Sequence, residues 1–146
     1  MSNQIRYIVF PASREEFPSL LEYEQFLRDV VPGPQRNGIY HIRTKKTYKP
    51  MGEVPVGSIV VFRIFGSHLG HARVQVGLRP QFEASRRELY PYYITFEPSS
   101  VTLFPKKLSM DDFRGIYHHR FYPRNYLDMT REEYVRLARA AGSEPL

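Results

Sequence analysis

The middle of the chain carries its clearest hydrophobic pattern. Residues 58–65 and 71–78 are apolar, β-branched segments, and Gly66 to Gly70 separates them. Glycine adopts positive φ at little cost, so this spacing predicts a β-hairpin whose turn spans Gly66 to Gly70. We expect this hairpin to be central in the sheet because it is the most apolar paired segment.

Shorter apolar segments predict the other strands. Residues 5–10, 92–96 and 100–104 are rich in β-branched and aromatic residues, and residues 38–44 alternate weakly, as an edge strand does. Residues 80–90 have the composition of an exposed loop or short helix. Short connections favour antiparallel pairing of these strands.

Three capping boxes predict the helices. Each is a Ser or Thr followed three residues later by an acid, which lets the two residues satisfy each other's free N–H groups. The pairs are Ser19 with Glu22, Ser109 with Asp112, and Thr130 with Glu133. The first helix should end at Pro32-Gly33-Pro34, and the last should run over 131–141 and end at Gly142.

The elements together predict an α+β fold, a small mixed or antiparallel β-barrel flanked by helices. Residues 1–141 form the expected domain, and residues 142–146 form a tail or the start of a linker. A chain of 146 residues has the size of one domain, which is also the size of one module of a longer protein.

Composition excludes several classes of function. The chain has no cysteine, which excludes disulfides, cysteine-ligated zinc and thiol catalysis. No apolar run approaches the ~18 residues that span a bilayer. We therefore expect a cytoplasmic protein without a membrane partner.

The positive charge is concentrated in one part of the sequence. The whole chain has a net charge of +6, yet residues 30–82 alone hold eight basic residues and one acid, Glu53. A polarised positive field attracts polyanions, which favours a nucleic-acid partner over a protein partner.

Several motifs have both a functional and a structural interpretation. One motif combines an aromatic ring with cations: Tyr40, Arg43, Lys45 and Lys46. In the functional interpretation the ring stacks on a base while the cations contact phosphate. In the structural interpretation the same residues form a solvated edge strand. Ser67 and His68 either contact nucleic acid from the hairpin turn or simply form it. Arg73 is either a phosphate contact or an outward-facing strand residue.

Several stretches resemble the PUA-like superfamily, nearest to its EVE, YTH and ASCH branches. They occur in the family's order and are the segments 7–13, 36–37, 56–62, 68–74, 90–98 and 124–134. The resemblance implies a pocket between the barrel and the first helix that accepts a modified or flipped base against aromatic walls. The chain has no Trp, a common cage residue in these branches.

The resemblance also implies which residues line that pocket. We expect Phe10, Tyr40 and Tyr92 as walls, with polar groups from Ser13, Arg36, Asn37, Arg124 and Asn125. Asn37, Tyr40 and Ser13 should approach one concave site.

We therefore expect a non-catalytic reader of a modified or flipped base in DNA or RNA, without a cofactor or metal. Such a module also occurs with an attached or associated effector domain, as in modification-dependent restriction systems. The alternatives are an ASCH-type small hydrolase of modified nucleosides and a protein-interaction module. The sequence shows no Ser-His-Asp order and no phosphate-binding glycine loop, which argues against an enzyme. The adjacent His118 and His119 would point apart on a strand, which argues against their binding one metal ion.

Overall fold

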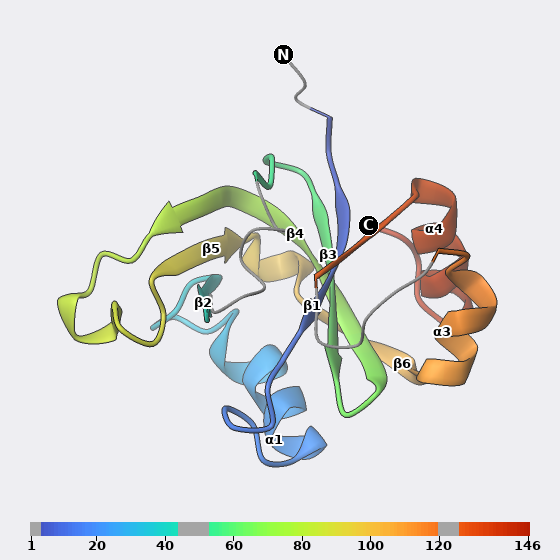
Figure 1. Ribbon diagram of the computed structural model, residues 1–146, viewed down its shortest axis with the longest axis horizontal. Helices are drawn as coiled ribbons and strands as arrows, with labels where there is room; N and C mark the ends of the chain where they lie inside the picture. The colour runs from blue at the N-terminus through green and yellow to red at the C-terminus, as the bar shows by residue number, and fades with distance from the viewer. Residues whose placement is uncertain (1–3, 44–52, 120–125) are drawn as a thin grey trace.

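The computed structural model describes residues 4–43, 53–119 and 126–146. Its strands form one mixed sheet with helices on both sides (Figure 1). The strands are β1 (Tyr7–Pro11), β2 (Ile39–Ile42), β3 (Ile59–Ile64), β4 (Ser67–Pro80), β5 (Tyr92–Phe96), β6 (Thr102–Ser109) and β7 (Leu127–Met129). The helical elements are α1 (Leu20–Gln25), the π-helical η1 (Phe26–Val30), η2 (Ala84–Arg86), η3 (Pro98–Ser100), α3 (Met110–Ile116) and α4 (Arg131–Ala140).

The predicted hairpin is central. The hydrogen-bonded order is β2-β5-β4-β3-β1-β7, and β6 pairs with β4 off this path. The long strand β4 pairs with β3 and β6 through its first half and with β5 through its second half, and bulges shift its register. The α+β class is confirmed, whereas the described strands do not close into a barrel, because β2 and β7 stand at open ends of this order.

The turn of the hairpin differs from the prediction. Ile64 pairs with Ser67, so the turn is only Phe65 and Gly66, with φ of 52° and 72°. Positive φ at both central residues is the two-residue hairpin geometry that suits twisted strands. Gly70 lies within β4 for another reason, since a Cβ there would come 2.3 Å from the Thr102 carbonyl oxygen on β6.

β1 pairs with β3 in parallel, with Tyr7 opposite Ile59, so the sheet is mixed, one of the two arrangements that the sequence predicted. The chain between these two strands includes α1, η1 and β2, a connection long enough for a parallel crossover. β7, which the sequence did not predict, pairs antiparallel with β1 on its other side.

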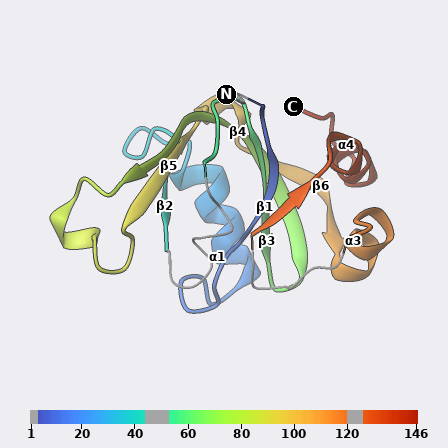
Figure 2. The same ribbon diagram turned by 45° about the horizontal axis from the view of Figure 1, so that its top comes forward.

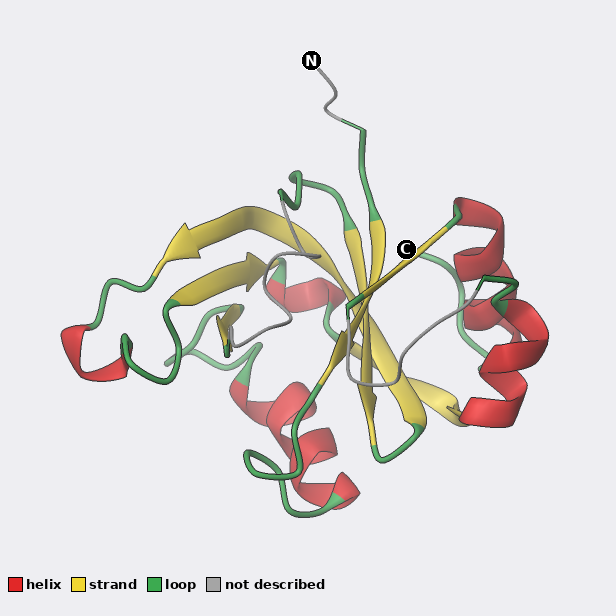
Figure 3. Cartoon of the chain, viewed as in Figure 1, coloured by secondary structure: helices red, strands yellow, loops and turns green. Residues whose placement is uncertain are grey.

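The sheet separates two hydrophobic cores because successive strand residues point to opposite faces. Ile8 and Phe10 of β1 belong to the core under α1 and η1, and Val9 belongs to the core under α3 and α4. Figures 2 and 3 show α1 on one side of the sheet and α3 with α4 on the other. β2, β5, α1 and η1 all contribute buried residues to the first of these cores, and the pocket described below lies beside them.

All three capping boxes are present, each with both reciprocal hydrogen bonds. The buried carboxylate of Glu133 also accepts a hydrogen bond from the His118 N–H at 3.0 Å, which ties α4 to the end of α3. None of the described helices has the length and apolar character that a membrane span requires.

Candidate nucleic-acid pocket

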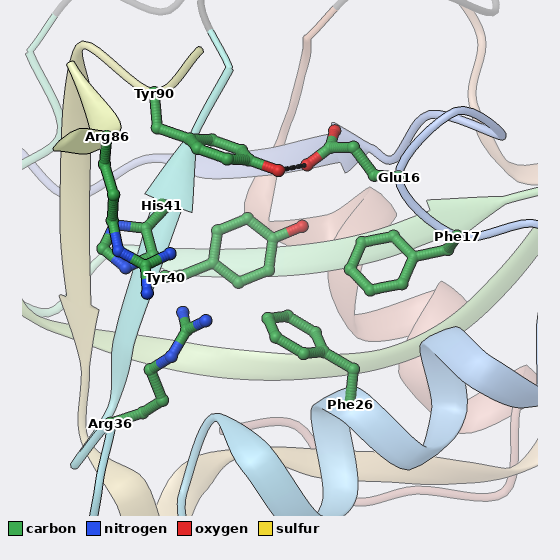
Figure 4. A pocket seen from close by; sticks show the side chains of 8 residues that line it. All are labelled: Glu16, Phe17, Phe26, Arg36, Tyr40, His41, Arg86 and Tyr90. Atoms are coloured by element: carbon green, nitrogen blue, oxygen red, sulfur yellow. Dashed lines mark hydrogen bonds between the residues drawn. The ribbon is translucent and has the colours of Figure 1, made fainter. Parts of the chain in front are cut away.

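A cavity of about 210 Å³ opens between the first helix, β2 and the segment that precedes β5. Eight side chains line it: Glu16, Phe17, Phe26, Arg36, Tyr40, His41, Arg86 and Tyr90 (Figure 4). Four are aromatic and three more are cationic or imidazole groups. The cavity therefore combines flat apolar faces with hydrogen-bonding groups in one small space.

Tyr40 is buried and hydrogen-bonded. Its side chain is only 8% exposed, and its hydroxyl shares a 2.7 Å hydrogen bond with the hydroxyl of buried Tyr23 on α1. Burial raises the pKa of both phenols well above their usual range, so both remain neutral. Tyr40 thus presents a rigid ring to the cavity and no charge.

Phe26 and Phe17 form a second aromatic wall, with ring centroids 4.9 Å apart. Phe26 opens the π-helical turn η1, in which Val31 N–H donates to the Phe26 carbonyl at 3.0 Å. Such widened turns are rare and are frequent at functional sites. The Arg36 guanidinium carbon lies 5.6 Å from the Phe26 ring centroid, a cation–π distance.

Tyr90 and Glu16, two of the lining residues, are joined by a hydrogen bond. The Tyr90 hydroxyl donates to Glu16 Oε2 at 2.9 Å (Figure 4). Burial raises the pKa of Tyr90, and the charge of Glu16 adds to that effect. This bond joins residues 74 positions apart in the sequence and holds the Tyr90 hydroxyl beside Glu16.

His41 is held as a neutral imidazole by Gln81. The Gln81 amide donates to the Tyr90 carbonyl at 3.0 Å and accepts from the Glu83 N–H at 3.3 Å, which fixes its orientation. Its second N–H therefore donates to His41 Nδ1 at 2.9 Å. Burial, followed by the charges of Arg36 and Arg86, lowers the pKa of His41 to about 4, so Nε2 carries the ring proton at neutral pH.

The structure brings only some of the sequence-predicted residues to the cavity. Arg36 and Tyr40 line the cavity. Asn37 is exposed beside it in a left-handed conformation with φ of 49°, and Ser13 accepts hydrogen bonds at the turn that positions Glu16. Their roles in binding stay predictions.

Phe10 and Tyr92 were expected as walls, and the structure corrects both. Phe10 is 1% exposed and packs edge-on to Tyr126 at 5.0 Å in the core, so no base can reach its face. Tyr92 is half-buried on β5 and does not line the cavity, where Tyr90 stands instead. Arg43 pairs with Glu15 at 3.0 Å.

Ser67, His68 and Arg73 lie on β4 and line no part of this cavity. His68 is buried and stacked on Phe113 at 4.2 Å, which corrects the expectation that it contacts nucleic acid from a turn. Arg73 pairs with Glu97 at 3.1 Å. Lys45, Lys46, Arg124 and Asn125 lie outside the described residues.

Most of the lining residues were not predicted as site residues. They are Glu16, Phe17, Phe26, His41, Arg86 and Tyr90. His41 adjoins Tyr40 in the basic and aromatic motif, which was the one signal available for it. Glu16 and Phe17 come from the turn between β1 and α1, and Phe26 comes from η1. Arg86 and Tyr90 come from the segment before β5, and only the fold brings these parts of the chain together.

Comparison with known proteins identifies the fold. No protein-family model matches this chain, and no curated protein matches it. A protein from Agrobacterium tumefaciens is 14% identical, with 97% of this chain and 96% of that chain covered and a TM-score of 0.63. An ASCH protein from Zymomonas mobilis is 10% identical, with 91% and 94% covered and a TM-score of 0.57.

A YTH domain is also similar. The domain from Zygosaccharomyces rouxii, crystallised in complex with N6-methyladenosine RNA, is 12% identical, with 97% of this chain and 89% of that chain covered and a TM-score of 0.56. This chain therefore has a PUA-like fold near those of ASCH and YTH domains, as the sequence predicted. The nearer likeness to EVE domains stays a prediction.

Proposed function

We propose that this protein binds a single unstacked base of a nucleic acid in the aromatic cavity, without catalysing a reaction on it. The observation that carries the proposal is the combination of aromatic walls and arginines in one cavity between the first helix and the sheet. The YTH domain with the same fold, solved with N6-methyladenosine RNA, supports it.

Two physical terms supply the affinity. A base stacked on an aromatic ring gains roughly 1–3 kcal/mol, whatever its sequence context. Arg36 and Arg86 line the cavity beside the rings, and we expect their positive charges to attract backbone phosphates, which adds a term that depends on salt. A base must leave its own stack to enter, so single-stranded nucleic acid is the favoured partner.

Binding without chemistry is part of the proposal. Of the eight lining side chains, Glu16 is the one carboxylate, and its Oε2 already accepts the Tyr90 hydroxyl. The resemblance of the sequence to ASCH domains makes hydrolysis of modified nucleosides the alternative to exclude. We expect free modified nucleosides to remain intact by chromatography after incubation with the protein, and release of a product would overturn this part of the proposal.

The binding test uses Tyr90, because its ring is accessible whereas Tyr40 is tied into the core. Fluorescence anisotropy with labelled single-stranded RNA and DNA should show that Tyr90→Ala weakens binding about 5- to 150-fold, the loss of one stacking interaction. Tyr90→Phe keeps the ring and should retain most of the affinity. Arg136→Ala, on exposed α4 away from the cavity, controls for loss of a charge.

Two outcomes would contradict the proposal. One is no measurable binding of any oligonucleotide by the wild-type protein. The other is binding that Tyr90→Ala leaves unchanged, which would place the nucleic acid elsewhere on the surface.

A further inference from the structure

We propose that Gln81, a buried residue outside the cavity lining, is a positioning residue of this site: it fixes His41 so that the Nε2–H donates to an acceptor atom of the bound base. This inference rests on the proposed function and adds one polar contact to it. It is carried by the hydrogen bonds that the Gln81 side chain makes around the cavity.

The Gln81 side chain uses both N–H groups and the oxygen of its amide. Its nitrogen donates to His41 Nδ1 at 2.9 Å and to the Tyr90 carbonyl at 3.0 Å. Its oxygen accepts from the Glu83 N–H at 3.3 Å. Reversing the amide would set its oxygen against the Tyr90 carbonyl and its N–H groups against the Glu83 N–H, and a buried polar group left unpaired is costly. The amide is therefore a fixed donor toward His41.

The main chain of Gln81 closes the connection between β4 and β5. Its N–H donates to the Pro91 carbonyl at 2.8 Å, which joins the two ends of this connection. Between them, the Tyr90 N–H donates to the Arg86 carbonyl at 2.7 Å. Arg86 and Tyr90 line the cavity, and His41 belongs to β2. Gln81 therefore ties this wall of the cavity to β2.

The His41 ring has one polar atom left for a ligand. His41 lines the cavity, where Figure 4 shows it beside Tyr40. Because Nδ1 accepts from Gln81, the neutral ring carries its proton on Nε2. No group in the described part of the chain accepts a hydrogen bond from this Nε2–H. A base in the cavity can supply that acceptor as a carbonyl oxygen or an unprotonated ring nitrogen.

The surroundings of His41 keep the ring neutral. The charged and titratable groups around it are Arg36, Glu83, Arg86, Tyr90 and Tyr93. Burial lowers the pKa of His41 to about 4, the two arginines add to this effect, and the carboxylate of Glu83 opposes it. In the wild-type protein His41 should therefore stay neutral between pH 5.5 and 8.

Gln81→Glu tests the proposal through the pH profile of binding. The introduced carboxylate cannot donate to His41, so it draws a proton to Nδ1 and raises the pKa of the imidazole. At pH 8 the neutral ring then has no proton on Nε2, and the affinity for a labelled mixed-sequence single-stranded RNA should fall about 2- to 12-fold, as for one lost hydrogen bond. Protonation of the ring restores the Nε2–H, so the affinity relative to the wild type should recover toward pH 5.5.

Two controls separate this effect from that of a charge alone. Gln75→Glu puts the same charge on an exposed position of β4 and should keep the wild-type pH profile. Gln81→Glu combined with His41→Phe should show no recovery at low pH, because the imidazole that takes up the proton is gone. A profile of Gln81→Glu parallel to that of the wild type, or a recovery that persists without His41, would overturn the proposal.

Nitrogen-15 NMR of the wild-type protein measures the tautomer directly and does not depend on the folding of a Gln81 variant. The His41 signals are assigned by their absence from His41→Phe, and at pH 7 Nε2 should be protonated and Nδ1 should not. The opposite tautomer would overturn the role of Gln81 and leave the proposed function standing. Binding of no oligonucleotide by the wild-type protein would instead reject the proposed function, and the contact between His41 and a base with it.

Discussion

At the scale of single residues, Gly38 joins three parts of the pocket region. Its N–H donates to the Val31 carbonyl at 2.7 Å, and its carbonyl accepts from the Phe96 N–H at 2.8 Å. Its φ is 92°, and a Cβ at this position would come 2.0 Å from the Phe96 carbonyl oxygen. Only glycine allows the end of the first helix and β5 to meet at the start of β2.

Gly38→Ala should therefore be strongly destabilising. The positive φ alone costs an alanine roughly 1–3 kcal/mol, and the backbone contact adds to that cost. Gly115→Ala is the matched control, because Gly115 lies in α3 and a Cβ there meets nothing within 4 Å. It should be neutral or stabilising by up to ~1 kcal/mol. Urea unfolding of both variants measures the difference, and equal midpoints would contradict this role of Gly38.

The residues of the pocket show how far local sequence reaches. Arg36 and Tyr40 were predicted, since they belong to a resemblance and to a basic and aromatic motif that are continuous in sequence. Glu16 and Tyr90 were not predicted, because their place in the cavity lining depends on the hydrogen bond between them. No local pattern in either segment signals a contact between residues so distant in the chain.

At the scale of elements, the capping boxes and the hairpin were predictable and the parallel pairing was not. A capping box is closed by residues three positions apart, as Ser109 and Asp112 are. The pairing of β1 with β3 depends instead on a long crossover, and β7 is only three residues long. The turn was predicted to extend too far because Gly70 is needed where β4 approaches β6 closely, and not for a bend of the chain.

The contact between β4 and α3 makes stability depend on pH. His68 of β4 stacks on Phe113 of α3, and burial lowers its pKa to about 3; burial also lowers the pKa of His71 to about 4. The unfolded chain takes up these protons below its ordinary pKa of ~6.5, whereas the folded chain does not until near pH 4. The contribution of these two histidines to the free energy of unfolding should thus be complete above about pH 7. It should decrease as the pH drops from 6.5 toward 4.

His68→Phe keeps a ring against Phe113 and removes one titrating group. Between pH 6.5 and 4 the variant should lose stability less steeply than the wild type, by roughly 1 kcal/mol per pH unit, which is the contribution of one proton. Denaturant midpoints at several pH values give both slopes. Equal slopes would mean that His68 titrates normally in the folded protein.

At the scale of the whole molecule, the charge count overstated the free positive surface. The basic excess over residues 30–82 includes Arg63, which is buried on β3, and Arg43 and Arg73, which pair with Glu15 and Glu97. A count along the sequence cannot distinguish these from Arg36, which lines the cavity. The predicted fold class is unaffected by this overestimate of free charge, because it depends on the number and order of the helices and strands.

The salt dependence of binding tests which cations remain available. Lys45 and Lys46 follow β2 in the sequence and were predicted to contact phosphate. Phosphate contacts carry no sequence information, so Lys45→Ala combined with Lys46→Ala should weaken the binding of all oligonucleotides alike. For single strands each lost contact should reduce the slope of log association constant against log salt by about 0.7.

Arg136→Ala combined with Arg139→Ala removes two exposed charges from α4 and should leave the slope unchanged, because α4 lies on the opposite side of the sheet from the cavity. If the α4 variant flattened the slope and the lysine variant did not, the nucleic acid would run over the α4 face, and the phosphate contacts would have to be sought there.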